Sequence, residues 1–110
     1  MFDKSLTLSR QNDIARRALG VACMLIQTPG ISALSMDDQS AIREKVELFD
    51  DFRRSNDPYG EHDFGAFEHD GKRIYWKIDY YDRNLEYGSE DPMNPQVTRR
   101  VLTIMLAEEY

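Results

Sequence analysis

Two adjacent residues near the middle of the chain, Asp70 and Gly71, constrain the fold more than any other feature. On both sides of this pair, apolar and polar residues alternate, which is typical of strands with one buried face. An Asp-Gly pair between two such runs predicts a two-residue β-hairpin, because both turn residues must adopt positive φ angles. A turn this tight also fixes which residues of the two strands face each other.

The predicted register makes chemical sense at three positions. Phe67 faces Ile74 as an apolar pair, and Glu68 faces Arg73 as a pair of opposite charges. Gly65 faces Trp76, whose indole can cover the space that the glycine leaves. These matches support the hairpin independently of the turn residues.

Extending the register by a few residues places His62 opposite Asp79. A carboxylate beside an imidazole fixes its tautomer and raises its basicity, as a general base or a metal-ligating histidine requires. Glu61 and Asp63 add carboxylates, so the candidate catalytic residues are His62, Asp79, Glu61 and Asp63. A structural interpretation carries more weight, since Asp57 precedes Pro58 in a typical turn and such pairs often only hold a loop. No cofactor is predicted, and no metal ligand is assigned.

Helical patterns flank the hairpin. The spacing of apolar residues predicts helices over 8–19 and 36–54, and a continuous apolar run predicts a buried strand over 21–27. Asn94 and Pro95 suit the start of a C-terminal helix, with Val97, Val101 and Ile104 following at helical spacing. A short fourth strand is expected near 85–87.

These elements predict one α+β domain over residues 1–110. Its antiparallel sheet is built on the central hairpin, and the helices pack on one face. The other face would then be available for binding.

Charge and composition narrow the classes of function. The chain has 110 residues, with 20 acidic and 14 basic side chains and a net charge of −6, which disfavours direct binding to nucleic acid. No apolar run reaches the roughly 18 residues of a membrane span, and no secretory signal is recognisable, so a cytoplasmic location is expected. The single cysteine, Cys23, excludes an intrachain disulfide and a multi-thiolate zinc site.

Tyrosines and carboxylates gather after the hairpin. Tyr75, Asp79 and Tyr81 share the strand face opposite to Trp76. Acidic residues surround the aromatic ones, which argues against a base-stacking platform and favours a protein-binding patch. The candidate binding residues are Tyr75, Asp79, Tyr81, Asp82, Glu86, Glu90 and Asp91. Residues 36–91 hold 16 acidic and 8 basic side chains, and such an excess can either imitate DNA or merely confer solubility.

Three strings carry a resemblance to a known family: NDPYGEHDFG at 56–65, WKIDYYD at 76–82 and TRRVLTIML at 98–106. They resemble a family of small bacterial proteins of unknown function, found mainly in alphaproteobacteria and often on plasmids or other mobile elements. The resemblance covers about 35–110. It implies no established activity or catalytic residue, but a context in which small acidic proteins often inhibit or regulate host systems, including as DNA mimics and anti-defence proteins.

The sequence therefore favours a small acidic binding protein that inhibits or regulates a protein partner, for example one that normally holds nucleic acid. The alternative is a metal-assisted or acid-base enzyme of hydrolase type, built on the cluster of His62 and Asp79. A toxin or antitoxin role is also compatible with the sequence. The oligomeric state is not assigned.

Overall fold

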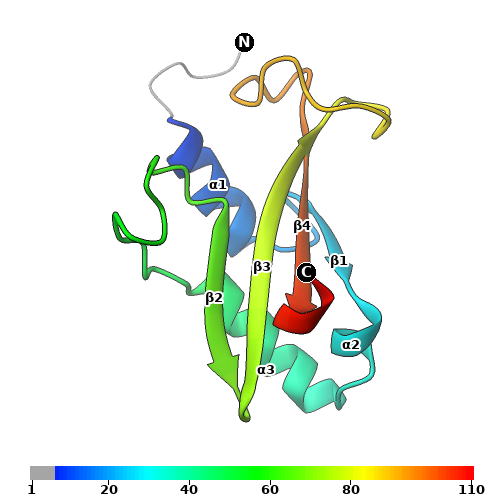
Figure 1. Ribbon diagram of the computed structural model, residues 1–110. Coiled ribbons are helices and arrows are strands. Elements are labelled where there is room, and N and C mark those ends of the chain that lie inside the picture. Colours follow the sequence, from blue (N-terminus) through cyan, green and yellow to red (C-terminus); the bar gives the residue numbers. More distant parts are fainter. Residues whose placement is uncertain (1–6) are drawn as a thin grey trace.

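A single mixed sheet organises the chain. The computed structural model describes residues 7–110. Its strands are β1 (Met24–Gln27), β2 (Phe64–His69), β3 (Lys72–Tyr81) and β4 (Arg99–Leu106). They lie side by side in the order β1-β4-β3-β2 (Figure 1). The pair β1 and β4 is parallel and the other two pairs are antiparallel, so the α+β class is confirmed with a mostly antiparallel sheet.

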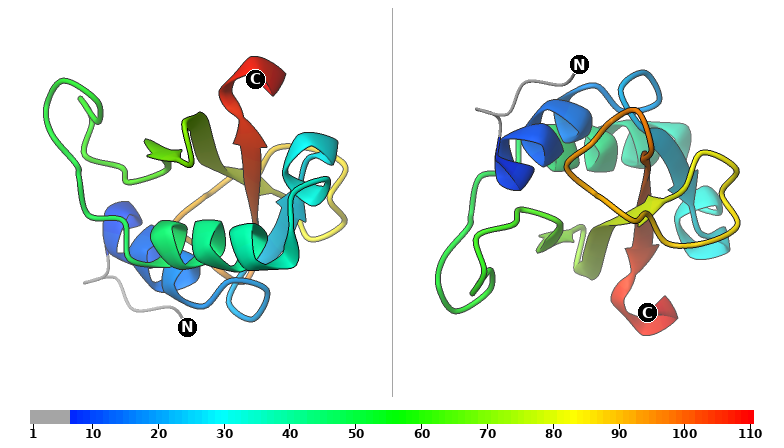
Figure 2. Two further views of the ribbon diagram at one scale, coloured as in Figure 1. Left: turned by 90° about the horizontal axis from the view of Figure 1, so that it is seen from below. Right: turned by 90° about the horizontal axis from the view of Figure 1, so that it is seen from above.

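The helices cover one face of this sheet. Helices α1 (Leu8–Arg17) and α3 (Met36–Glu47) lie across that face, whereas the short α2 (Pro29–Ser32) lies beside β1 (Figure 2). The C-terminal 3-10 helix η1 (Ala107–Glu109) projects on the other side. The core between helices and sheet contains Ile31, Ile42, Val46, Ile74, Trp76, Leu102 and Ile104. Apart from η1, the opposite face carries no helix of residues 7–110, and we call it the open face.

The hairpin has the predicted turn and register. Asp70 and Gly71 have φ angles of 51° and 75°, as a tight turn of this kind requires. Phe67, Gly65 and Glu68 pair with Ile74, Trp76 and Arg73, which confirms all three predicted matches. A side chain at Gly65 would overlap the Trp76 indole, so glycine is needed at this position.

The predicted C-terminal helix is wrong, because residues 99–106 form the strand β4. Asn94 and Pro95 lie in the loop before it. β4 is a central strand paired with both β1 and β3, and four of its side chains on the two faces are buried: Val101, Leu102, Ile104 and Met105. A strand covered on both faces is apolar at consecutive positions, and here that run also fits helical spacing.

The remaining elements differ from prediction mainly at their ends. The first helix is confirmed, whereas α3 ends at Glu47 rather than at residue 54. The strand expected over 21–27 exists as β1, but it is an edge strand whose alternate residues are exposed, not a buried one. Residues 85–87 lie in a loop, where a single bridge joins Tyr81 to Gly88 in place of a fourth strand.

Candidate functional site

His62 lies just beyond the hairpin ladder. The Ile78 N–H donates to the Asp63 carbonyl at 2.8 Å, so the predicted register continues one residue past β2. At His62 the backbone enters the left-handed region, with φ at 56°, and the chain turns away. The imidazole Nδ1 lies 3.0 Å from Asp13 Oδ1, and Nε2 lies 3.6 Å from Asp57 Oδ2. The predicted pair of His62 with Asp79 is therefore wrong, and two other carboxylates flank the ring.

Asp79 belongs to a different surface. It lies on the open face, where its carboxylate is 2.9 Å from the Lys77 ammonium. The hydrogen bond to Asp79 raises the pKa of Lys77, which keeps the lysine charged. The structure thus separates Asp79 from the other three candidate catalytic residues.

Glu61 and Asp63 remain beside His62. Burial raises the pKa of Glu61, and the carboxylates of Asp63 and Asp57 add to this effect. Asp63 accepts a hydrogen bond of 3.0 Å from the Tyr80 hydroxyl. The cluster therefore combines one imidazole with several nearby carboxylates from α1 and from the segment before β2.

A buried polar network supports this cluster from below. The Asn12 amide is fully buried and donates to the Tyr80 hydroxyl at 2.7 Å and to the Glu61 carbonyl at 2.9 Å. Its carbonyl oxygen accepts from Arg100 Nε at 2.8 Å. Burial is the main cause that raises the pKa of Tyr80, so its phenol stays protonated. These contacts join α1 to β3, β4 and the segment that carries His62.

Arg16 forms the second part of the network. Its side chain is 1% exposed, and it donates to Asp13 Oδ1 and to the Phe49 carbonyl, both at 2.8 Å. Its guanidinium lies 5.2 Å from the centre of the Phe52 ring, on which the His62 imidazole stacks at 3.8 Å. Burial acts to raise the pKa of Asp13, but the hydrogen bonds and charges of Arg16 and His62 outweigh it and lower that pKa. Asp13 is thus a fixed anion between two cationic or protonatable groups.

The chemistry open to this cluster is proton transfer at His62, whose side chain is 26% exposed. Within residues 7–110, no group of three or more His, Cys, Asp or Glu side chains is arranged to hold a metal ion. Sequence reasoning missed five members of the network: Asn12, Asp13, Arg16, Tyr80 and Arg100. A signal existed, because Asn12, Ala15 and Arg16 lie on one side of the first helix, where the apolar stripe is thin.

The open face is the second candidate site. Tyr75, Lys77, Asp79 and Tyr81 of β3 lie there with alternate residues of β4 and β1. A hollow of about 430 Å³ crosses this face. Its lining includes Met24, Ile26, Lys77, Asp79, Tyr81, Thr103, Met105 and Tyr110. Ile26 is 45% exposed and Tyr110 73% exposed, so much apolar surface remains in contact with solvent.

The remaining acidic candidates lie in the loop between β3 and β4, beyond the end of the sheet, rather than across the open face. Asp82 follows β3, and its carboxylate accepts hydrogen bonds from the backbone N–H groups of Asn84 and Glu86. Asp91 likewise accepts from the Met93 N–H, so both carboxylates shape the loop between β3 and β4. Glu86 and Glu90 are exposed in the same loop.

The fold and these two sites define a two-layer α+β domain, with a polar network between the helices and the sheet and with no α-helix of residues 7–110 on the opposite face. A family model described as a protein of unknown function (DUF3768) matches residues 27–109. The chain therefore belongs to this family. No match was found among curated proteins or among solved structures. None of the helices within residues 7–110 is long and apolar enough to cross a membrane.

Proposed function

We propose that this protein is a binding protein that holds a protein partner on the open face and thereby inhibits or regulates it. The observation that carries the proposal is the sheet face that no α-helix of residues 7–110 covers, with its hollow between Tyr81, Ile26 and Tyr110. Aromatic and apolar side chains of this kind are typical anchors of protein interfaces. The ion pair of Lys77 and Asp79 supplies polar groups beside them.

Charge favours a basic partner. The net charge is −6, and the loop between β3 and β4, at the end of the sheet, carries Asp82, Glu86, Glu90 and Asp91. Such acids would speed the approach of a positively charged protein and leave the apolar hollow to slow its release. A protein that normally holds nucleic acid has the required charge. An anti-defence role in the cytoplasm of a bacterium, encoded on a mobile element, fits this proposal and depends on it.

The test compares two matched substitutions in tagged protein expressed in its native host. Ile26→Asp places a carboxylate in the hollow of the open face. Met36→Asp places a carboxylate on α3, on the helical side of the molecule, at a side chain that is 72% exposed to solvent. We expect cross-linking to capture the same partner with the unmodified protein and with Met36→Asp, but not with Ile26→Asp. Circular dichroism melts serve to check that both variants fold. Equal capture by both variants would refute the proposal.

Salt gives a second measurement on the captured partner. Raising the ionic strength from about 0.05 to 0.5 M screens steering charges, so the association rate should fall steeply while the dissociation rate changes little. An association rate that is independent of salt would remove the role of the acidic loop.

Acid-base catalysis at His62 is the second candidate function. Its support is the imidazole between Asp13 and Asp57, which lies in a partly exposed cluster. The test is His62→Gln in the intact organism: a biological effect that survives this substitution rules the enzyme out.

A further inference from the structure

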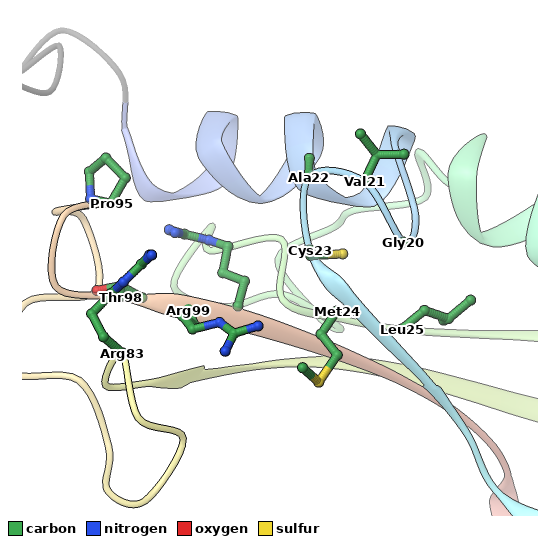
Figure 3. Close-up of a pocket in the computed structure, with 11 residues that line it drawn as sticks. Gly20, Val21, Ala22, Cys23, Met24, Leu25, Arg83, Pro95, Thr98 and Arg99 are labelled. Carbon is green, nitrogen blue, oxygen red and sulfur yellow. The ribbon is translucent and has the colours of Figure 1, made fainter.

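A further pocket lies at the end of the sheet where β4 begins, next to the open-face hollow and to the buried polar network. Its volume is about 640 Å³, within the usual range for small-ligand pockets. Three segments form its walls: residues 20–25, the loop residue Arg83, and the stretch from Pro95 to Arg100 (Figure 3). It shares only Met24 with the hollow of the open face.

The charge of this pocket is opposite to that of the protein. Arg83, Arg99 and Arg100 all line it, and no Asp or Glu is among the lining residues. In a chain with 20 acidic and 14 basic residues, three arginines without a carboxylate form a local exception. Within residues 7–110, Arg83 and Arg99 make no ion pair, although Arg16 and Arg53 each bind an aspartate.

Arg100 provides a fixed third charge. Its guanidinium donates to Asn12 and Gln11 and to the Pro92 carbonyl. It is thereby held in place by neutral acceptors, so its positive charge is not neutralised. Arg83 and Arg99 are free to bind a ligand, and Arg100 adds to the field that attracts it.

The backbone around the pocket is held by hydrogen bonds. The loop that carries Arg83 is closed by a bond from the Asp82 N–H to the Tyr87 carbonyl at 2.8 Å. The opposite wall is fixed by Thr98, whose hydroxyl donates to the Asp91 carbonyl at 2.7 Å. Figure 3 shows the Arg83 side chain extending toward Thr98 and the Arg99 guanidinium directed toward Met24. A loop and a strand thus present two guanidinium groups from rigid supports.

We infer that this pocket binds a phosphorylated small molecule, with Arg83 and Arg99 holding the phosphate. A phosphate monoester carries nearly two negative charges and three acceptor oxygens. It can therefore accept hydrogen bonds from two guanidinium groups at once, and it fits this pair of arginines better than a single carboxylate does. Inorganic phosphate alone would leave most of the volume empty. Val21 and Ala22 on one wall and Pro95 on another provide apolar surface for the organic part of the ligand. The inference does not depend on the proposed partner.

The experiment measures binding of four probes to the full chain by calorimetry and by thermal shift: adenosine monophosphate, adenosine, inorganic phosphate and succinate. We expect the phosphate ester to bind most tightly and to raise the melting temperature, because a ligand of the folded state stabilises it. Adenosine lacks the charge, and inorganic phosphate lacks the organic part. Succinate carries two charges as carboxylates and tests the preference for phosphate.

Two variants locate the binding. Arg83→Gln and Arg99→Gln should each lower the affinity for the phosphate ester about tenfold or more, because each removes a charged hydrogen-bond donor. The matched control is Arg54→Gln, an exposed arginine in the loop before β2 and outside the pocket. It should bind as the unmodified protein does.

Each contrary result overturns a defined part of the inference. Failure of all four probes to bind at millimolar concentration refutes an anion pocket, as does unchanged affinity in both pocket variants. Adenosine or inorganic phosphate binding as tightly as the ester refutes the phosphate-ester class, and succinate doing so refutes the preference for phosphate. Loss of partner capture by Ile26→Asp is a separate result and affects none of these outcomes.

Discussion

The two faces of the sheet differ in how their polar and apolar side chains are buried. On the covered face, Arg16 and Asn12 are almost completely buried, yet each has several fixed partners. On the open face, Tyr81, Lys77 and Ile26 remain at least partly exposed, and Lys77 is paired only with Asp79 among the ion pairs of residues 7–110. The buried groups of the covered face therefore contribute to the stability of the domain, whereas the exposed side chains of the open face can change without unfolding it. This difference separates residues that hold the fold from residues that are available for binding.

The largest effect should come from the centre of the covered face. Trp76→Ala removes a fully buried side chain that packs against Gly65 and lies 5.5 Å from the Phe49 ring. We expect a loss of about 3–5 kcal/mol in the free energy of unfolding, as for other large buried side chains. Urea denaturation measures it. Tyr81→Ala, on the open face of the same strand, is the control and should cost about 1 kcal/mol or less. Equal losses would abolish the contrast between the faces.

A smaller loss is expected in the polar network. Asn12→Ala removes the acceptor of Arg100 and the donor to the Glu61 carbonyl, which leaves buried polar groups without partners. We expect about 1–3 kcal/mol of destabilisation by urea denaturation. Asn84→Ala, at an exposed amide in the β3–β4 loop, serves as the control and should be nearly neutral. A neutral Asn12→Ala would mean that the network is not needed for the fold.

The polar network on the covered face should also make the stability of the protein depend on pH, through Asp13. The pKa of Asp13 is lowered in the folded protein, so its ionised form contributes stability above the unfolded pKa of about 3.9, and this contribution is lost as the pH falls through the folded value. Asp13→Asn should therefore be less stable than the unmodified protein above about pH 5, and the gap should narrow below about pH 4. Thermal unfolding across this range measures the gap. A gap that is constant with pH would show that the charge of Asp13 contributes nothing.

The accuracy of sequence reasoning also differs between regions. The hairpin could be predicted residue by residue, because a two-residue turn fixes the register of both strands and Asp70 and Gly71 are local signals. β4 could not be predicted in this way. Its partner β1 is distant in sequence, a long loop separates β4 from β3, and its buried apolar run fits both a strand and a helix. Its β-branched residues Val101, Thr103 and Ile104 were the available signal for a strand.

The candidate site shows the same limit. The register correctly placed Asp63 opposite Ile78, but it said nothing about where the ladder ends. One residue further, the backbone of His62 turns, and the imidazole meets Asp13 of α1 instead of Asp79. Contacts between a loop and a helix that lies 49 residues away follow from packing, not from counting along strands. Tyr75 and Tyr81 were placed on the open face correctly because that placement needs only the alternation of β3.

The smallest effect on stability belongs to the ion pair on the open face, where it is most informative about binding. Lys77→Gln breaks the contact with Asp79, and both side chains are more than one-third exposed. Exposed pairs contribute about 0–1 kcal/mol, so urea denaturation should detect little change. Binding of the captured partner should weaken, because the freed Asp79 carboxylate would then have to lose its water without a cation beside it. Lys72→Gln, which loosens an exposed pair with Asp70 at the hairpin turn, is the matched control. If Lys77→Gln lowers stability by several kcal/mol, or leaves the partner's affinity equal to that of the control, the open face is not the separate binding layer inferred from its exposure.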